Sequence, residues 1–203
     1  MLPLALALLM GAASPIDSLC PEFPASGRTT YRTVDSLLSE VRRSSFPELA
    51  GEDIVLNELH SASDFFTSGT ELRTFLKARR QRAYLVYVNP KLFENPPPRA
   101  AIRAVLAHEL SHIVDYNRRS APGLARFTFH YLTSNEASYE RATDLATLGR
   151  GYGCGLIAYR EWLYRRVSPK SAAVKRRTYL TPEEIRAWLT TGSLPPAAPA
   201  GPE

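Results

Sequence analysis

The clearest periodic pattern of apolar residues lies in the middle of the chain. Three prolines at 96–98 precede it, and apolar side chains then recur every three or four residues, which predicts a long helix over residues 98–117. Its broad apolar stripe consists of Ile102, Val105, Leu106, Leu110, Ile113 and Val114. A stripe of this width is typical of a helix that packs one face against a core.

Two short segments have the composition of β-strands. Residues 83–88, AYLVYV, are mostly β-branched and aromatic, and Asn89 followed by Pro90 ends the run. Residues 54–59, IVLNEL, form a second candidate strand. Together with the helical segments, these strands predict a mostly helical α+β fold with a small sheet.

Two threonines are placed to cap helices in the first half of the chain. Thr33 precedes apolar residues at helical spacing, namely Val34, Leu37, Leu38 and Val41. Thr70 likewise precedes a segment that carries Leu72, Phe75 and Leu76. We therefore expect a helix to follow each threonine.

Three helices are expected in the second half of the chain. One is predicted over residues 134–148, where the glycine-rich stretch 149–155 ends it, and a second over residues 156–167. The last helix is the best marked. Thr181 begins the sequence TPEE, which has the spacing of an N-cap, a first-turn proline and a capping-box acid.

Both ends of the chain differ in composition from its middle. Residues 1–13, MLPLALALLMGAA, are apolar, uncharged and end in small residues, which predicts a signal peptide and an exported protein, periplasmic or secreted. An uncleaved anchor and a misassigned start codon are the alternatives. We expect an N-terminal arm over 14–32, one domain over 33–192 and a flexible, proline- and alanine-rich tail over 193–203.

Two cysteines, Cys20 and Cys154, lie far apart in the sequence. In an oxidising compartment they could form one disulfide that ties the N-terminal arm to the domain. Two unpaired thiols are the equally weighted alternative, because pairing requires Cα atoms within about 7 Å of each other.

Composition and charge narrow the class of protein. The 203 residues are 44% hydrophobic and 22% charged, which argues against a disordered, collagen-like or multi-span membrane protein.

The net charge of +5 arises in the C-terminal part, where residues 116–203 carry 13 basic and seven acidic groups. The segment from Arg160 to Arg177 interleaves aromatic and basic residues and could meet an anionic surface. A solvated helix face is the favoured interpretation, and no nucleic-acid motif is present.

A metal-binding pattern lies within the predicted central helix. In the sequence HELSH, His108 and His112 are four residues apart and project from the same helix face, so both imidazoles can reach one metal ion. Glu109 points about 100° further around the helix, where it can hold a water on the metal without being a ligand. This is the geometry of a zinc hydrolase in which Glu109 is the general base.

HELSH and the segment after it resemble the zincin metallopeptidases, in particular the gluzincin branch that includes thermolysin-like and HtpX-like enzymes. The resemblance implies a zincin-like fold with a small sheet packed on the active-site helix. In that branch a second helix supplies a glutamate ligand and, one turn later, an aspartate that orients a ligand histidine. The sequence SYERATDLA matches this spacing, which implies Glu140 as the third zinc ligand and Asp144 as the partner of His108.

Other residues compete for these roles. Glu136 precedes Glu140 by four residues, so it is the alternative third ligand at the same spacing. His60 and His130 lie outside any matching motif and are expected to be structural or exposed. Asp115 is expected to be a solvated acid at the end of the helix.

The sequence therefore predicts a monomeric, exported peptidase with one zinc ion and a protein or peptide substrate. The alternative is a non-enzymatic periplasmic binding or scaffold protein with a zincin-like metal site. The histidine or tyrosine that would stabilise the oxyanion is not assigned, and three tyrosines are candidates: Tyr139, Tyr152 and Tyr159.

Overall fold

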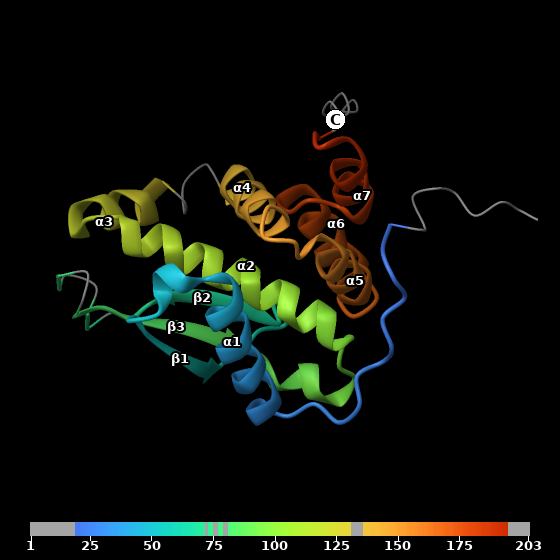
Figure 1. Cartoon of the computed structure of the whole chain (residues 1–203), viewed down its shortest axis with the longest axis horizontal. Coiled ribbons are helices and arrows are strands. Elements are labelled where there is room, and N and C mark those ends of the chain that lie inside the picture. The colour runs from blue at the N-terminus through green and yellow to red at the C-terminus, as the bar shows by residue number, and fades with distance from the viewer. Residues whose placement is uncertain (1–18, 72, 75–76, 79–80, 131–135, 195–203) are drawn as a thin grey trace, which may run out of the picture.

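The fold consists of a small sheet and a set of helices on either side of one long helix (Figure 1). The computed structural model describes residues 19–71, 73–74, 77–78, 81–130 and 136–194. The predicted signal peptide therefore lies outside the described residues, as does all of the predicted tail except residues 193–194. None of the described helices combines the length and the apolar character needed to cross a membrane.

The sheet has three strands in the order β1-β3-β2. The strands are β1 (Asp53–Glu58), β2 (Phe66–Thr70) and β3 (Ala83–Val88). The central strand β3 is parallel to β1 and antiparallel to β2, and its Val88 pairs with Glu58 and Phe66. Both predicted strands are present, whereas β2 was not predicted because its sequence, FTSGT, is short and largely polar.

The long helix α2 (Arg99–Arg118) lies at the centre of the molecule. Each residue of its predicted apolar stripe is at most 7% exposed. The sheet and α1 (Tyr31–Ser45) lie on one side of α2 (Figure 1). On the other side lie α4 (Glu136–Leu148), α5 (Gly153–Tyr164), α6 (Pro169–Thr178) and α7 (Pro182–Thr191). Because α2 is covered from both sides, nearly all of its side chains from Ala101 to Val114 are buried.

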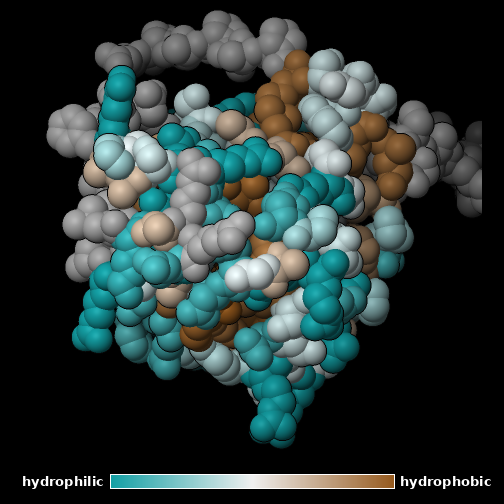
Figure 2. All heavy atoms as spheres, turned by 60° about the vertical axis from the view of Figure 1, so that its left-hand side comes forward, coloured by the Kyte–Doolittle hydropathy of each residue, from teal (hydrophilic) through white to brown (hydrophobic). Residues whose placement is uncertain are grey.

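The remaining helices complete the mostly helical α+β fold, which confirms the predicted fold class. They are α3 (Ala121–His130), α4 (Glu136–Leu148), α5 (Gly153–Tyr164), α6 (Pro169–Thr178) and α7 (Pro182–Thr191), with 3-10 turns at Pro47–Leu49 and Pro90–Glu94. On the face shown in Figure 2, hydrophilic residues cover most of the surface and hydrophobic ones appear only in patches.

Two expectations for the first half of the chain are wrong. Thr30, not Thr33, is the N-cap of α1, and Thr33 is its capping-box partner, so α1 begins within the expected arm. Thr70 is the last residue of β2, where it pairs with Tyr84, and does not cap a helix. The three apolar residues expected in that helix, Leu72, Phe75 and Leu76, lie outside the described residues.

The helix α5 begins three residues earlier than expected, within the glycine-rich stretch, where two glycines have identifiable roles. Gly151 has a φ of 86°, a left-handed conformation that suits the turn after α4. Gly155 lies within α5 at its contact with α2, where a Cβ atom would be 2.4 Å from the carbonyl oxygen of Ala100. This stretch therefore allows close approach of two helices as well as ending α4.

The C-terminal helices differ in how clearly the sequence marks them. The capping box of Thr181 and Glu184 begins α7 as predicted, and Gly192 ends the helix in a left-handed conformation. No helix was predicted for α6, because its sequence, PKSAAVKRRT, has no apolar stripe. Ser168 nevertheless caps α6, and Pro169 occupies its first position.

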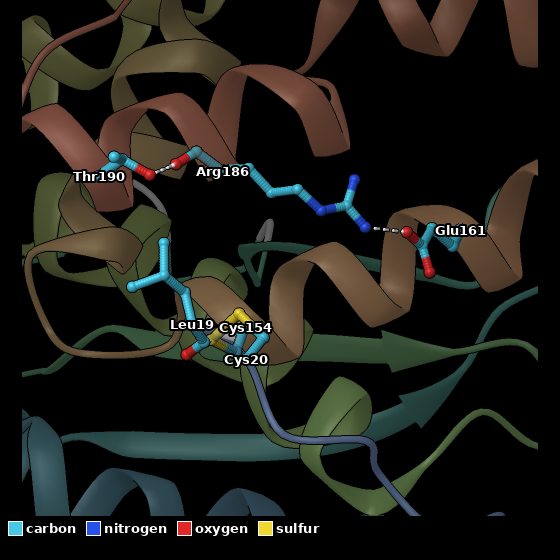
Figure 3. The surroundings of a disulfide bond; sticks show 6 residues. All are labelled: Leu19, Cys20, Cys154, Glu161, Arg186 and Thr190. Carbon is cyan, nitrogen blue, oxygen red and sulfur yellow. Dashed lines mark hydrogen bonds and ion pairs between the residues drawn. A yellow bond between two sulfur atoms is a disulfide. The ribbon is translucent and has the colours of Figure 1, made fainter. Parts of the chain in front are cut away.

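A disulfide between Cys20 and Cys154 joins the N-terminal arm to the first turn of α5 (Figure 3). Of the two alternatives for the cysteines, the disulfide is the one present. Close by, an ion pair between Glu161 and Arg186 links α5 to α7. The arm is thus attached to the helical side of the molecule.

Candidate metal centre

Three buried side chains from two helices meet at one point. His108 and His112 lie one turn apart on α2, and their Nε2 atoms are 3.0 Å from each other. Glu140 of α4 places Oε2 3.0 Å from Nε2 of His108 and 3.2 Å from Nε2 of His112. The three residues are at most 5% exposed, and together they could hold a metal ion.

The size of this triangle fits a single zinc ion. Ligand atoms at about 2.0–2.1 Å from a tetrahedral zinc ion are about 3.3–3.4 Å apart. The three ligand atoms of His108, His112 and Glu140 are separated by only a few tenths of an ångström less than that. Two imidazoles and a carboxylate are also ligands of a type that zinc accepts in hydrolases.

Contacts between α4 and α2 place Glu140 opposite the histidines. Next to it, Tyr139 donates a hydrogen bond to Asp115 of α2 at 3.0 Å. One turn earlier, Glu136 is exposed and lies on the rim of the cleft beside the site. The structure thus brings Glu140, and not Glu136, to the two histidines.

Each histidine also has a partner behind it. Asp144, one turn after Glu140, is fully buried, and its Oδ1 lies 2.8 Å from Nδ1 of His108. The hydroxyl of Thr143 lies 3.4 Å from Nδ1 of His112. A partner on Nδ1 fixes the ring orientation and directs Nε2 toward the metal position.

Two further groups hold Asp144. Arg160 of α5 pairs with Oδ1 at 2.9 Å, and the backbone N–H of Leu180 donates to Oδ2 at 2.9 Å. Sequence reasoning missed this role, because it placed Arg160 on a basic surface. Arg160 is only 3% exposed, and Lys175 from the same segment is also buried. The exposed basic residues of the segment from Arg160 to Arg177 are Arg165, Arg166, Lys170, Arg176 and Arg177.

The buried charges shift one another's pKa. Burial alone lowers the pKa of His108, but the neighbouring carboxylates Asp144 and Glu140 outweigh it and raise that pKa to about 10. Burial alone raises the pKa of Glu140, but the two histidines hold it well below the usual range. Without a metal, a proton on His108 is therefore favoured by its carboxylate partners.

Glu109 lies beside the three ligand residues without belonging to their triangle. It is 5% exposed and lines the same cleft as the two histidines. Burial raises the pKa of its carboxyl group, and the positive charges of His108 and His112 oppose that rise. A buried carboxyl group with a raised pKa is better suited to take up and release a proton than an exposed one.

The cleft over the metal centre has a volume of about 270 Å³. Its lining includes Thr67 and Ser68 of the edge strand β2, and also Glu136 and Tyr179. Tyr116 also lines the cleft, where its ring stacks on His112 with the ring centres 6.0 Å apart. The cleft therefore gives a bound molecule access to both histidines and to Glu109.

None of the three candidate tyrosines for the oxyanion lines the cleft. Tyr139 packs on His112 and bonds to Asp115, and Tyr152 shares a hydrogen bond with Ser45 of α1. Tyr159 is buried beneath the site. Tyr116 and Tyr179 line the cleft instead, and neither was singled out, because no local motif marks them.

A second cavity of about 300 Å³ adjoins the cleft beside α6. It shares Asp64, Glu136 and Tyr179 with the cleft. Lys175 of α6 pairs with Asp64 at 2.7 Å and joins the helix to the loop between β1 and β2. The side chain of Asn89 donates to two carbonyl oxygens of that loop, so this wall is held from both sides.

The remaining candidate residues are not part of the group that could hold a metal within the described residues. His60 is an exposed side chain 3.6 Å from Glu58, and His130 is the last residue of α3. Asp115 is half-buried: it accepts hydrogen bonds from Arg119 and Tyr139, so it joins α2 to α4 and is not a freely solvated acid.

The ligand triangle, the adjacent Glu109 and the cleft are the features of this chain that bear on its function. Comparisons with models of protein families, with curated proteins and with solved structures find no match. The resemblance to the gluzincins thus rests on the His-Glu-x-x-His and Glu-x-x-x-Asp spacings.

Proposed function

We propose that the protein is a zinc-dependent peptidase of the gluzincin type. The observation that carries the proposal is the buried triangle of His108, His112 and Glu140, with ligand atoms 3.0–3.2 Å apart, beside the cleft that Glu109 lines. A zinc ion held there supplies a Lewis acid for the scissile carbonyl and lowers the pKa of a coordinated water to about 7.

The number of ligands favours an enzyme over the non-enzymatic alternative. Structural zinc sites are usually closed by four protein ligands, whereas catalytic sites have three and keep one position open. Within the described part of the chain, the group that could hold a metal consists of His108, His112 and Glu140. The three ligands face a cleft, which supports an open fourth position.

Glu109 is the proposed general base. Its carboxylate accepts the proton of the attacking water and then donates that proton to the nitrogen of the leaving amine. Thr143 and Asp144 keep the two imidazoles oriented, and the walls of the cleft hold the peptide over them. One carboxylate thus performs both proton transfers without changing its place.

Export is proposed together with this activity. The disulfide between Cys20 and Cys154 supports it, since disulfides persist mainly in oxidising compartments. The apolar sequence of residues 1–13 is consistent with the same location. The proposed substrates are therefore peptides or unfolded proteins outside the cytosol.

The variant Glu109→Gln tests the proposal. We expect it to bind one zinc ion as the wild type does and to lose hydrolysis of casein by about 10²-fold or more, because the amide cannot accept the proton. Glu183→Gln is the matched control, since it changes the same residue type at an exposed position of α7 that does not line the cleft. Equal activity of Glu109→Gln and the wild type would reject Glu109 as the base.

A further inference from the structure

Arg160 is a buried cation directly behind the metal centre. Its guanidinium lies 2.9 Å from Oδ1 of Asp144, the same oxygen that lies 2.8 Å from Nδ1 of His108. Arg160 is 3% exposed and Asp144 is 0% exposed, so water does not compete for either group. A single carboxylate oxygen thus connects the arginine to a proposed zinc ligand.

Arg160 reaches His108 by a second route. The guanidinium lies over the ring of Tyr179, 4.2 Å from its centre. That ring in turn contacts His108 edge to face, with the ring centres 5.9 Å apart. The planar guanidinium therefore contacts two different groups that pack against the same imidazole.

Charge balance gives a reason for a cation in this position. Glu109, Glu140 and Asp144 are three buried carboxyl groups around two histidines. Burying a charge without a partner is unfavourable, and Arg160 provides the partner for Asp144. The charges of the other two carboxylates then match that of one divalent cation in the ligand triangle.

We propose that Arg160 is a positioning residue of the metal centre, which holds Asp144 and Tyr179 against His108 so that Nε2 of His108 faces the metal. This inference rests on the proposed zinc site. The backbone N–H of Leu180 holds Asp144, whereas the guanidinium of Arg160 contacts both Asp144 and the ring of Tyr179.

The test is the zinc affinity of full-length variants, measured by competition with a chromophoric chelator. We expect Arg160→Met to raise the Kd for zinc by about 10- to 100-fold, the usual effect of losing a partner behind a ligand histidine. Arg160→Lys should recover part of the affinity, because it restores the charge but not the planar fork. Arg176→Met is the matched control, since Arg176 lies over Tyr164 but is exposed.

Two more variants separate positioning from folding. Ile185→Val removes one buried methylene from α7, away from the ligands, and should lower thermal stability while leaving zinc affinity unchanged. The double variant Arg160→Met/Asp144→Asn removes both buried charges, so it is expected to fold even if Arg160→Met does not. Its Kd should be lower than the two single losses would give if they multiplied, since Arg160 acts in part through Asp144.

The outcomes distinguish this inference from the proposed function. Zinc affinity of Arg160→Met within about twofold of the wild type would overturn the role of Arg160 and leave the zinc site in place. The fold-increase in Kd of the double variant could equal the product of the fold-increases of Arg160→Met and Asp144→Asn. That result would overturn the route through Asp144. A wild type that binds no zinc would overturn the metal site itself.

Discussion

At the scale of single residues, the site is a set of charges that are buried because they compensate one another. Glu140 interacts with both histidines, and Asp144 interacts with His108 and Arg160. Glu140 and Asp144 therefore each have cationic or hydrogen-bonding partners, which offset the cost of removing these two carboxylates from water. At the rim of the site, Asp64 and Lys175 form a similar but more exposed pair.

The pair of Asp64 and Lys175 should make stability depend on acid pH. Burial raises the pKa of Asp64, but the hydrogen bond and charge of Lys175 outweigh it, so the folded-state pKa is lowered. The contribution is therefore present above the unfolded pKa of about 3.9 and is lost as pH falls through the lower, folded-state value. With 46% of the Asp64 side chain exposed, we expect Asp64→Asn to cost only about 1 kcal/mol or less at pH 7.

Urea unfolding of Asp64→Asn and the wild type between pH 7 and pH 3 measures this effect. The difference in the free energy of unfolding should shrink as the wild type is acidified. Asp35→Asn, a change of an exposed carboxylate on α1, serves as the control. A difference that stays constant over this range would contradict the role of the Asp64 charge.

The residues of the site differ in how far the sequence alone could identify them. His108, Glu109 and His112 follow from spacing within one helix, which is a local property. The choice between Glu140 and Glu136 depends on how α4 packs on α2, so spacing left it open. The sequence predicts Arg160 on a basic surface, because its partner Asp144 lies on another helix and nothing local marks the pair.

At the scale of elements, the contact between α2 and α5 determines where Arg160 lies. Gly155 permits this contact, because a Cβ atom there would be 2.4 Å from Ala100 O and 2.9 Å from Ala104 Cβ. Backbone atoms cannot move aside as a flexible side chain can. The two helices can therefore approach this closely because residue 155 has no side chain.

Gly155→Ala should therefore lower the free energy of unfolding by about 1–3 kcal/mol, the usual cost of overpacking a close contact. Chemical denaturation of the variant and the wild type measures the change. The control is Gly27→Ala, where an added Cβ would have nothing within 4 Å. Equal stability of Gly155→Ala and the wild type would show that the helices separate without cost.

Predictability from the sequence also varied among the elements. The central strand β3, the helix α2 and the capped helix α7 carry strong local signals, and all three were predicted. The edge strand β2 and the helix α6 carry weak ones, since β2 is short and polar and α6 has no apolar stripe. The strand β2 forms because it pairs with β3, and the helix α6 forms because it packs among the C-terminal helices.

At the scale of the whole molecule, the disulfide closes most of the chain into one loop. Cys20 and Cys154 are separated by 134 residues, and the loop contains the sheet, α2 and α4. Closing a long loop restricts the unfolded chain more than closing a short one. The N-terminal arm thus contributes to stability although it has no regular structure between residues 21 and 30 other than a bend.

Replacing both cysteines by serine should lower the free energy of unfolding by about 2–5 kcal/mol. Denaturant unfolding with and without a reducing agent measures the effect. Reduction should destabilise the wild type to a similar extent and leave the double serine variant unchanged. A wild type whose stability does not respond to reduction would contradict a structural role for this disulfide.

The central claim is that His108, His112 and Glu140 hold one zinc ion. The most direct test is the zinc content of the purified protein, measured by elemental analysis for the wild type and for Glu140→Ala and Glu136→Ala. We predict about one equivalent of zinc in the wild type and in Glu136→Ala, and almost none in Glu140→Ala, because two histidines alone bind zinc weakly. One equivalent retained by Glu140→Ala, or none in the wild type, would contradict the account.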